Sequence, residues 1–311
     1  MSDRWRRGLG ILTFVLMAAA LALVVHVLQQ FTLAKVWASL RHIGPVPIAL
    51  AALCTAASYL ALTGFDWLGV TYAGGRVPYR RVALASFLSL SIGHTVGLAP
   101  FSSGAIRYRY YSEWGLDARQ IGLVMLLSAV TVTLGEGGLT GFALIFRPDL
   151  AERVIAIGQV GALVIGIACI AGLALYLALA VIMRRPFRLW RWQVRMPEWR
   201  IAAGQIGLGL FNYACVAGAL HALLSSAAPV DYGTTATAFV LGNLAALVTH
   251  VPGGLGILEA VVVMVLPGID AIGPLIAFRI VYYLAPLGIG SLLFGLAEIK
   301  QRRGARAEFR P

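Results

Sequence analysis

The sequence predicts an all-α, polytopic membrane protein, and three observations support this class. Hydrophobic residues make up 59% of the 311 residues and charged residues only 12%, whereas soluble domains carry about 25% charged residues. Several apolar runs exceed the roughly 18 residues that indicate a membrane-spanning helix. A transmembrane barrel would need segments of about ten residues that alternate apolar and polar side chains, and the sequence contains none. A single integral membrane domain is therefore expected over residues 1–311.

Eight apolar segments account for most of the chain. The first, 8–28, follows Arg4, Arg6 and Arg7 and resembles a secretory signal. It is longer than a typical signal, and the chain stays apolar after it, so we interpret it as an uncleaved span. The other seven predicted segments are 46–71, 82–106, 119–146, 154–183, 201–225, 234–267 and 273–297. Proline and glycine interrupt 82–106 and 234–267, and both are therefore predicted to be broken helices.

The basic residues predict the orientation of these segments. Twenty of the 25 Lys and Arg residues cluster in five places: near the N-terminus, at 76–81, 107–119 and 184–200, and after residue 299. Such clusters mark cytoplasmic segments, so both termini are predicted to be cytoplasmic. The same clustering argues against nucleic-acid binding, although the formal net charge is +12.

This orientation constrains the two broken segments. Residues 72–81 are predicted inside and 147–153 outside, and 119–146 supplies one full crossing between them. The segment 82–106 must then enter from the cytoplasm and return to it. Counting crossings in the second half in the same way, the segment 234–267 must enter from the outside and return to the outside. The sequence therefore predicts six full spans and two re-entrant broken-helix hairpins from opposite faces. Irregular backbone at this depth is tolerated where protein or a water-filled cavity surrounds it.

The two halves share this pattern at a spacing of 152 residues. Shifted by 152 positions, the last four segments fall on segments of the first half, and Pro100/Pro252, Gly104/Gly256 and Arg107/Glu259 come into register. We therefore predict an inverted-topology repeat, with halves of about 1–150 and 153–300 and helical parts of about 8–146 and 154–297. Paired breaks in corresponding halves indicate a transport site.

The hairpin tips are predicted at the prolines. Proline removes a helical N–H, and neighbouring serine and glycine residues suit a turn. Backbone N–H groups exposed at such tips could bind an anion. The predicted tip residues are Pro100, Ser102, Ser103 and Gly104 in the first half and Pro252, Gly253, Gly254 and Gly256 in the second.

Charged and polar residues inside the apolar segments are the candidate transport residues. A charge in hydrocarbon costs at least about 2.5–3.5 kcal/mol, so it is a functional candidate by default. A guanidinium suits an anion, and Glu136 lies among glycines that let another backbone or a ligand approach. If the tips meet near the midplane, Arg107 and Glu259 could pair, and a purely structural ion pair stays open. The candidates are Asp66, Arg107, Glu136, Asn243, Glu259 and Arg279.

The remaining chemistry-bearing residues predict no catalytic site, metal site or cofactor. Three cysteines lie far apart in apolar runs without metal-type spacing, which indicates buried thiols. His94 and His250 are 156 positions apart, out of register with the repeat. We therefore expect them to be neutral, hydrogen-bonded side chains rather than metal ligands.

Four ordered motifs resemble one known family. They are Phe65-Asp66-Trp67-Leu68, then Gly104-Ala105-Ile106-Arg107-Tyr108-Arg109-Tyr110-Tyr111, then Val251-Pro252-Gly253-Gly254-Leu255-Gly256-Ile257-Leu258-Glu259, then Arg279-Ile280-Val281-Tyr282-Tyr283. Together they resemble the transmembrane region of bacterial lysylphosphatidylglycerol synthase, also called the multiple peptide resistance factor flippase domain. The resemblance implies movement of a phospholipid between leaflets and functional roles for Asp66 and Arg279.

The resemblance also limits what is expected. In the family, a soluble C-terminal domain makes the aminoacylated lipid, whereas this chain ends shortly after its last predicted span. We therefore expect no enzymatic activity, and a flippase-like transporter of an anionic, zwitterionic or aminoacylated phospholipid. Two alternatives stay open: a small-solute or proton-coupled transporter, and a membrane scaffold for a separately encoded synthase. The expected partner is membrane phospholipid, with a homo-oligomer or a separate partner protein also open.

Overall fold

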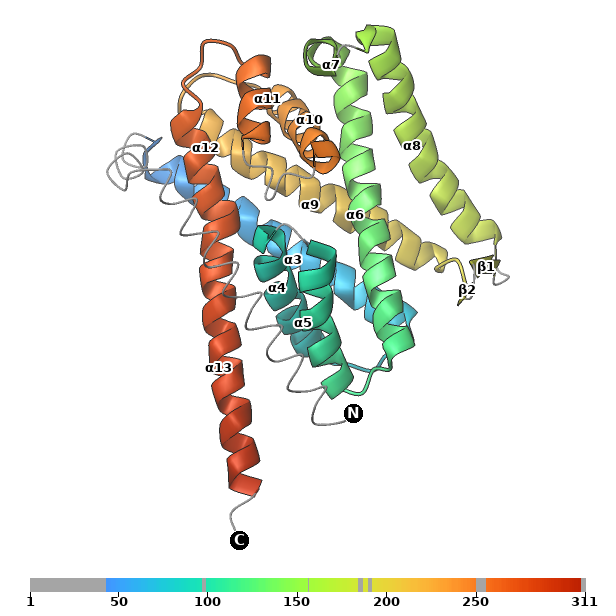
Figure 1. The fold of residues 1–311 in the computed structure, drawn as a ribbon. Coiled ribbons are helices and arrows are strands. Elements are labelled where there is room, and N and C mark those ends of the chain that lie inside the picture. Colours follow the sequence, from blue (N-terminus) through green and yellow to red (C-terminus); the bar gives the residue numbers. More distant parts are fainter. Residues whose placement is uncertain are drawn as a thin grey trace.

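The computed structural model describes residues 43–96, 99–155, 157–183, 187–189, 192–249 and 256–308. These form a bundle of helices with one short β-hairpin (Figure 1). The helices are α3 (Pro45–Tyr72), α4 (Tyr79–Val96), α5 (Ala99–Glu113), α6 (Ala118–Phe146), α7 (Pro148–Ile155), α8 (Gly158–Ile182), α9 (Trp199–Leu224), α10 (Tyr232–Thr249), α11 (Ile257–Val265), α12 (Ile272–Arg279), the π-helix η2 (Ile280–Leu284) and α13 (Ala285–Glu308).

Five stretches in the described residues are long and apolar enough to cross a membrane. They are α3, α6, α8, α9 and Ile272–Ala297, which combines α12, η2 and the first part of α13. These correspond to five of the six predicted full spans, and the sixth, 8–28, lies outside the described residues. The prediction of an all-α membrane protein is thus confirmed, apart from one feature that was not predicted. Strands β1 (Phe187–Leu189) and β2 (Trp192–Val194) form a small antiparallel hairpin after α8.

The centre of the bundle is the packing of α3 against α9, with α6 packed on both (Figure 1). Glycines permit the closest approach, between α6 and α9. A Cβ added at Gly135 would lie 2.5 Å from the Gly209 backbone, and one added at Gly209 would lie 2.8 Å from the Thr131 carbonyl oxygen. Small residues at helix crossings are typical of membrane bundles, where close van der Waals packing replaces the hydrophobic effect.

The first predicted hairpin appears as α4 packed against α5. Its two outer ends lie at one edge of the bundle, because α4 follows the end of α3 and α5 leads into the start of α6. A hydrogen bond of 3.2 Å from the Gln120 side chain to the Ala73 carbonyl joins these two connections. Helix α4 ends at Val96 and α5 begins at Ala99.

The second predicted hairpin appears as α10 packed against α11. Its outer ends lie near the other end of α6, where Arg147, the C-cap residue, bonds Asp231 and Thr234 at the start of α10. Helix α7, which follows α6, packs on both arms. The two hairpins therefore adjoin opposite ends of α6, as Figure 1 shows for α4 and α5 against α10 and α11.

The predicted tip residues need a correction in the first hairpin. Pro100, Ser102, Ser103 and Gly104 belong to the first turns of α5, so the break precedes Pro100 rather than coinciding with it. Proline is tolerated there because the first helical N–H groups have no partner in the helix. In the second hairpin, Pro252, Gly253 and Gly254 lie outside the described residues.

Three helices of the second half begin at close to the predicted spacing of 152 residues from helices of the first half. Helices α9, α10 and α12 begin 154, 153 and 154 positions after α3, α4 and α6, and α4 and α10 both contain 18 residues. Two departures from the predicted segments are local. The predicted span 154–183 corresponds to α8, which begins only at Gly158, because residues 154 and 155 end α7; Gly158 has a φ of +69° that favours glycine. The last span contains a π-helix.

Candidate functional site

Asp66 and Arg107 form a fully buried ion pair that joins α3 to α5. Arg107 Nε donates to Asp66 Oδ2 at 2.8 Å and Nη2 donates to Oδ1 at 2.9 Å. The Tyr111 hydroxyl donates to Oδ2 and the Ser128 hydroxyl to Oδ1, both at 2.9 Å. The side chains are 7% and 0% exposed for arginine and aspartate. With two donors on each carboxylate oxygen, the pair is closed to a ligand and ties α5 to α3 and α6.

Glu259 and Arg279 form a second bidentate pair, between α11 and α12. Arg279 Nε donates to Glu259 Oε1 at 2.8 Å and Nη2 donates to Oε2 at 3.1 Å. Here the carboxylate side chain remains 33% exposed and the arginine 10%. Arg279 also lies over the Tyr283 ring, 5.7 Å from its centroid. This pair therefore keeps an open side.

The local sequence explains how this second pair is built. Gly256 is the N-cap of α11 with a φ of +79°, a conformation that favours glycine, and Glu259 lies in the first turn of that helix. A carboxylate in the first turn is favoured by the helix dipole. Arg279 is the last residue of α12, directly before η2. Single π-turns often occur at functional sites.

Glu136 lies in α6 and is held by neutral groups. The Asn243 amide of α10 donates to Oε1 at 2.6 Å, and the Tyr213 hydroxyl of α9 donates to Oε2 at 3.4 Å. Among the described residues no cationic side chain bonds or pairs with this carboxylate. Glu136 therefore differs from Asp66 and Glu259, which each face an arginine.

A band of polar side chains continues from this cluster through the core. The Ser58 hydroxyl donates to Asn212 Oδ1 at 2.7 Å and lies 3.2 Å from the Tyr282 hydroxyl. The Tyr59 hydroxyl donates to the Tyr282 carbonyl at 3.4 Å. These contacts connect α3, α9 and η2 through hydroxyl, amide and carbonyl groups buried in the core.

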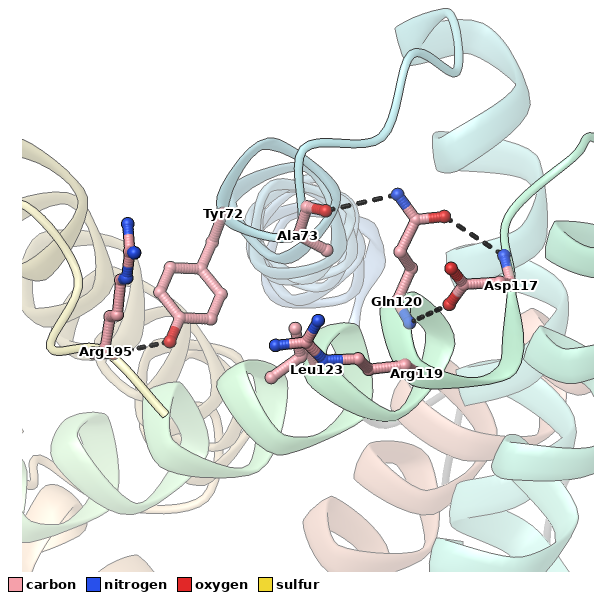
Figure 2. A pocket seen from close by; sticks show the side chains of 7 residues that line it. All are labelled: Tyr72, Ala73, Asp117, Arg119, Gln120, Leu123 and Arg195. Carbon is pink, nitrogen blue, oxygen red and sulfur yellow. Dashed lines mark hydrogen bonds between the residues drawn. The ribbon is translucent and has the colours of Figure 1, made fainter. Parts of the chain in front are cut away.

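A polar depression of about 430 Å³ lies where α3 ends and α6 begins (Figure 2). The Tyr72 hydroxyl donates to the Arg195 carbonyl, and Asp117 and Gln120 form the capping box of α6. Neither Arg119 nor Arg195 forms an ion pair within the described part of the chain. The lining residues are Tyr72, Ala73, Asp117, Arg119, Gln120, Leu123 and Arg195.

Comparison with known proteins now identifies the family. Residues 9–290 match the family described as the lysylphosphatidylglycerol synthase TM region. The chain belongs to this family. The resemblance inferred from the four motifs is therefore confirmed. The matched residues include both the Asp66–Arg107 pair and the Glu259–Arg279 pair.

Two curated relatives match along nearly the whole chain. A protein of Synechocystis sp., described as uncharacterized protein slr0712, is 28% identical over 305 residues, covering 97% of this chain and 94% of the relative. The inner membrane protein YbhN of Escherichia coli is 27% identical over 308 residues, covering 96% of this chain and 95% of the relative.

One predicted contact among the six candidate residues, the pairing of Arg107 with Glu259, is absent. Arg107 and Glu259 do not pair with each other. Arg107 binds Asp66 and Glu259 binds Arg279. The physical reason is helix placement, because α5 packs on α4 and α6 whereas α11 packs on α10 and α7. Glu136 and Asn243 do come together.

Three contributing residues were missed from the sequence. Tyr111 and Ser128 complete the bonding of Asp66, and Tyr213 bonds Glu136. A signal existed for Tyr111, which lies four residues after Arg107 and so on the same helix face. Ser128 and Tyr213 had no comparable signal, because isolated polar residues are common in apolar segments.

Proposed function

We propose that this chain is a flippase-like transporter that moves an anionic, zwitterionic or aminoacylated phospholipid between leaflets. Its family is described as the transmembrane region of a synthase of lysylphosphatidylglycerol, and its Escherichia coli relative is described as an inner membrane protein. Both descriptions support an inner-membrane setting with phospholipid as the partner. The acyl chains would stay in the bilayer while the headgroup passes along the polar interior.

The observation that carries this proposal is the half-open Glu259–Arg279 pair. Arg279 binds Glu259 through Nε and Nη2. One third of the Glu259 side chain is exposed, which leaves room for another anion to take its place. A headgroup phosphate could replace Glu259 as the bidentate acceptor, because guanidinium binds carboxylate and phosphate in the same geometry. Arg107 is less suited, since Asp66 occupies it inside a closed site.

The two hairpins supply the proposed route. We assign α4–α5 and α10–α11 as re-entrant hairpins of an inverted repeat, with both termini cytoplasmic. Their positions at opposite ends of α6 and the recurring helix spacing support this assignment. The depression in Figure 2 would then lie at the cytoplasmic headgroup level, where Arg119 and Arg195 suit lipid phosphates.

A reconstitution assay tests the function. Purified protein in vesicles containing one labelled phospholipid at a time should speed its exchange between leaflets, and Arg279→Ala should remove most of that rate. Arg153→Ala, in an exposed α7 residue, is the matched control and should keep it. Vesicles in which no phospholipid exchanges faster than in protein-free controls would overturn the proposal, and uptake of a water-soluble solute instead would support the alternative transporter.

Cysteine labelling tests the hairpin topology separately. In a background without Cys54, Cys169 and Cys215, single cysteines at Arg76 and Ala118 flank the first hairpin, and those at Ala227 and Asp270 flank the second. An impermeant thiol reagent should label the first pair from the cytoplasmic side and the second pair from the outside. Labelling of Arg76 and Ala118 from opposite sides would show that α4–α5 crosses completely.

A further inference from the structure

Glu136 is an acid inside a membrane span and, unlike Asp66 and Glu259, forms no ion pair within the described residues. Asp66 and Glu136 are the two acidic residues within the five described spans. Asp66 is matched by Arg107, whereas Glu136 receives hydrogen bonds from Asn243 and Tyr213 alone among the described residues. At 1.5 Å per residue, Glu136 lies about 15 Å from the Phe146 end of α6 and about 27 Å from the Ala118 end. It is therefore well within the span.

Physical chemistry leaves few stable states for such a group. An ionised carboxylate in this setting costs several kcal/mol unless a cation, water or strong donors stabilise it. Asn243 and Tyr213 supply two neutral donors but no charge. Uptake of a proton from water converts the carboxylate to the neutral acid, and release of the proton restores the charge that the two donors partly stabilise.

The surroundings of Glu136 identify the proton as the exchangeable partner. Helix α9 presents the Tyr213 phenol and α10 presents the Asn243 amide. Several other charged and titratable groups on the elements packed on α6 have partners of their own. Asp66 binds Arg107, Tyr59 binds the Tyr282 carbonyl, Tyr176 binds Gln205, His221 lies 3.4 Å from Thr235, and Arg147 binds Asp149 and Asp231. Cys169 and Cys215 are half-buried free thiols.

Space beside the carboxylate permits exchange. Glu136 is half-buried rather than enclosed, and a Cβ added at its neighbour Gly137 would meet no atom within 4 Å. By contrast, Gly135 packs directly on Gly209. The site is thus closed toward α9 and open on its other side.

The protonation state bears on the second hairpin through Asn243. The ionised carboxylate accepts a charge-assisted bond from Asn243 on α10, and such bonds are roughly twice as strong as neutral ones. After protonation, the new O–H can donate to the Tyr213 oxygen, and the bond from Asn243 becomes a neutral one. The connection between α6 and α10 is therefore weaker in the protonated state.

From these contacts we infer that Glu136 is a proton-binding site whose occupancy controls how tightly the α10–α11 hairpin is held to α6, and that it couples lipid movement to the proton gradient. The coupling rests on the proposed function, whereas the binding of a proton at Glu136 does not. No other co-reactant is needed, because one proton enters from water on one side and leaves to water on the other.

The coupling is tested by a pH gradient across vesicles that contain the wild-type protein or Glu136→Gln. Wild-type leaflet exchange should depend on the gradient, by up to about tenfold per pH unit for one coupled proton. Glu136→Gln keeps the shape and stays neutral, and its exchange should be the same with and without the gradient. Glu152→Gln, in an exposed α7 residue, should respond like the wild type. A gradient response retained in Glu136→Gln would overturn the coupling.

Infrared difference spectroscopy tests proton binding without any transport. The carbonyl band of a protonated carboxyl group should appear as the pH is lowered, be missing in Glu136→Gln and remain in Glu152→Gln. If the wild type exchanges no lipid but this band titrates, the lipid function fails and the proton site stands. If lipids exchange and Glu136→Gln leaves every carboxyl band unchanged, the proton site fails and the lipid function stands.

Discussion

Asp66–Arg107 in the first half and Glu259–Arg279 in the second are both bidentate pairs, yet only one of the two carboxylates is appreciably exposed. Asp66 is fully enclosed and also accepts from Tyr111 and Ser128, whereas one third of the Glu259 side chain is exposed. An enclosed pair with all its bonds made holds helices together, while a pair with an open side can exchange partners. The two pairs look alike in the sequence, but this difference leads us to assign a structural role to the enclosed pair and to propose a transport role for the open one.

The largest expected effect is on the enclosed pair. Arg107→Ala leaves the Asp66 carboxylate buried without its cation, which should cost about 3–5 kcal/mol of stability. Thermal unfolding in detergent micelles measures this loss. Arg279→Ala should cost clearly less, because Glu259 can be solvated. Equal losses in the two variants would contradict the distinction, and Asp66→Asn combined with Arg107→Gln should be more stable than Arg107→Ala alone.

The next largest effect on stability is expected at the crossing of α6 and α9. Gly135→Ala would place a Cβ 2.5 Å from the Gly209 backbone, and such overpacking should cost about 1–3 kcal/mol. Gly137→Ala is the matched control on the same helix, since its Cβ would meet open space. It should be neutral or slightly stabilising, because alanine favours helix over glycine. The same thermal unfolding measurement compares both variants.

At the open Glu259–Arg279 pair, a smaller change in free energy should still have a large effect on the rate of leaflet exchange. Arg279→Ala would remove the proposed charge-assisted contact to the headgroup, and a loss of about 1.4 kcal/mol already corresponds to a tenfold lower rate. Arg279→Lys keeps the charge but not the bidentate geometry, so its lipid exchange rate should lie between those of the wild type and Arg279→Ala. Leaflet exchange in vesicles measures this order, and a lysine variant no better than alanine would argue against charge as the main contribution.

The smallest effect is expected at the outer end of the second hairpin. Hydrogen bonds from Thr234 and the nearby Arg147 guanidinium lower the pKa of Asp231 below its ordinary value of 3.8. The stabilisation is therefore complete above that ordinary value and is lost as the pH falls through the lowered one. Asp231 is mostly exposed, so Asp231→Asn should change stability by about 0–1 kcal/mol. Its unfolding temperature should match the wild type once the pH has fallen below the lowered pKa of Asp231, and be slightly lower near neutrality.

The sequence predicted the helices well because long apolar runs decide them. The predicted span 46–71 became Pro45–Tyr72 and 119–146 became Ala118–Phe146. The pairing of the charges was harder to predict. Asp66 and Arg107 are 41 residues apart, and their contact depends on how α5 packs beside α3, which no local pattern specifies. The small β-hairpin and the π-turn after Arg279 likewise arise from packing rather than from composition.

The π-turn determines which way the side chains of the last span face after residue 284. A π-turn adds about one residue to a helical turn, which rotates everything after it by about 100° relative to an unbroken α-helix. Arg279, just before the turn, faces Glu259 on α11, and Gly290, after it, lies against Ser91 on α4. In a regular helix, residues 11 positions apart would point almost the same way. The extra residue therefore lets one continuous span serve the second hairpin with one face and the first hairpin with another.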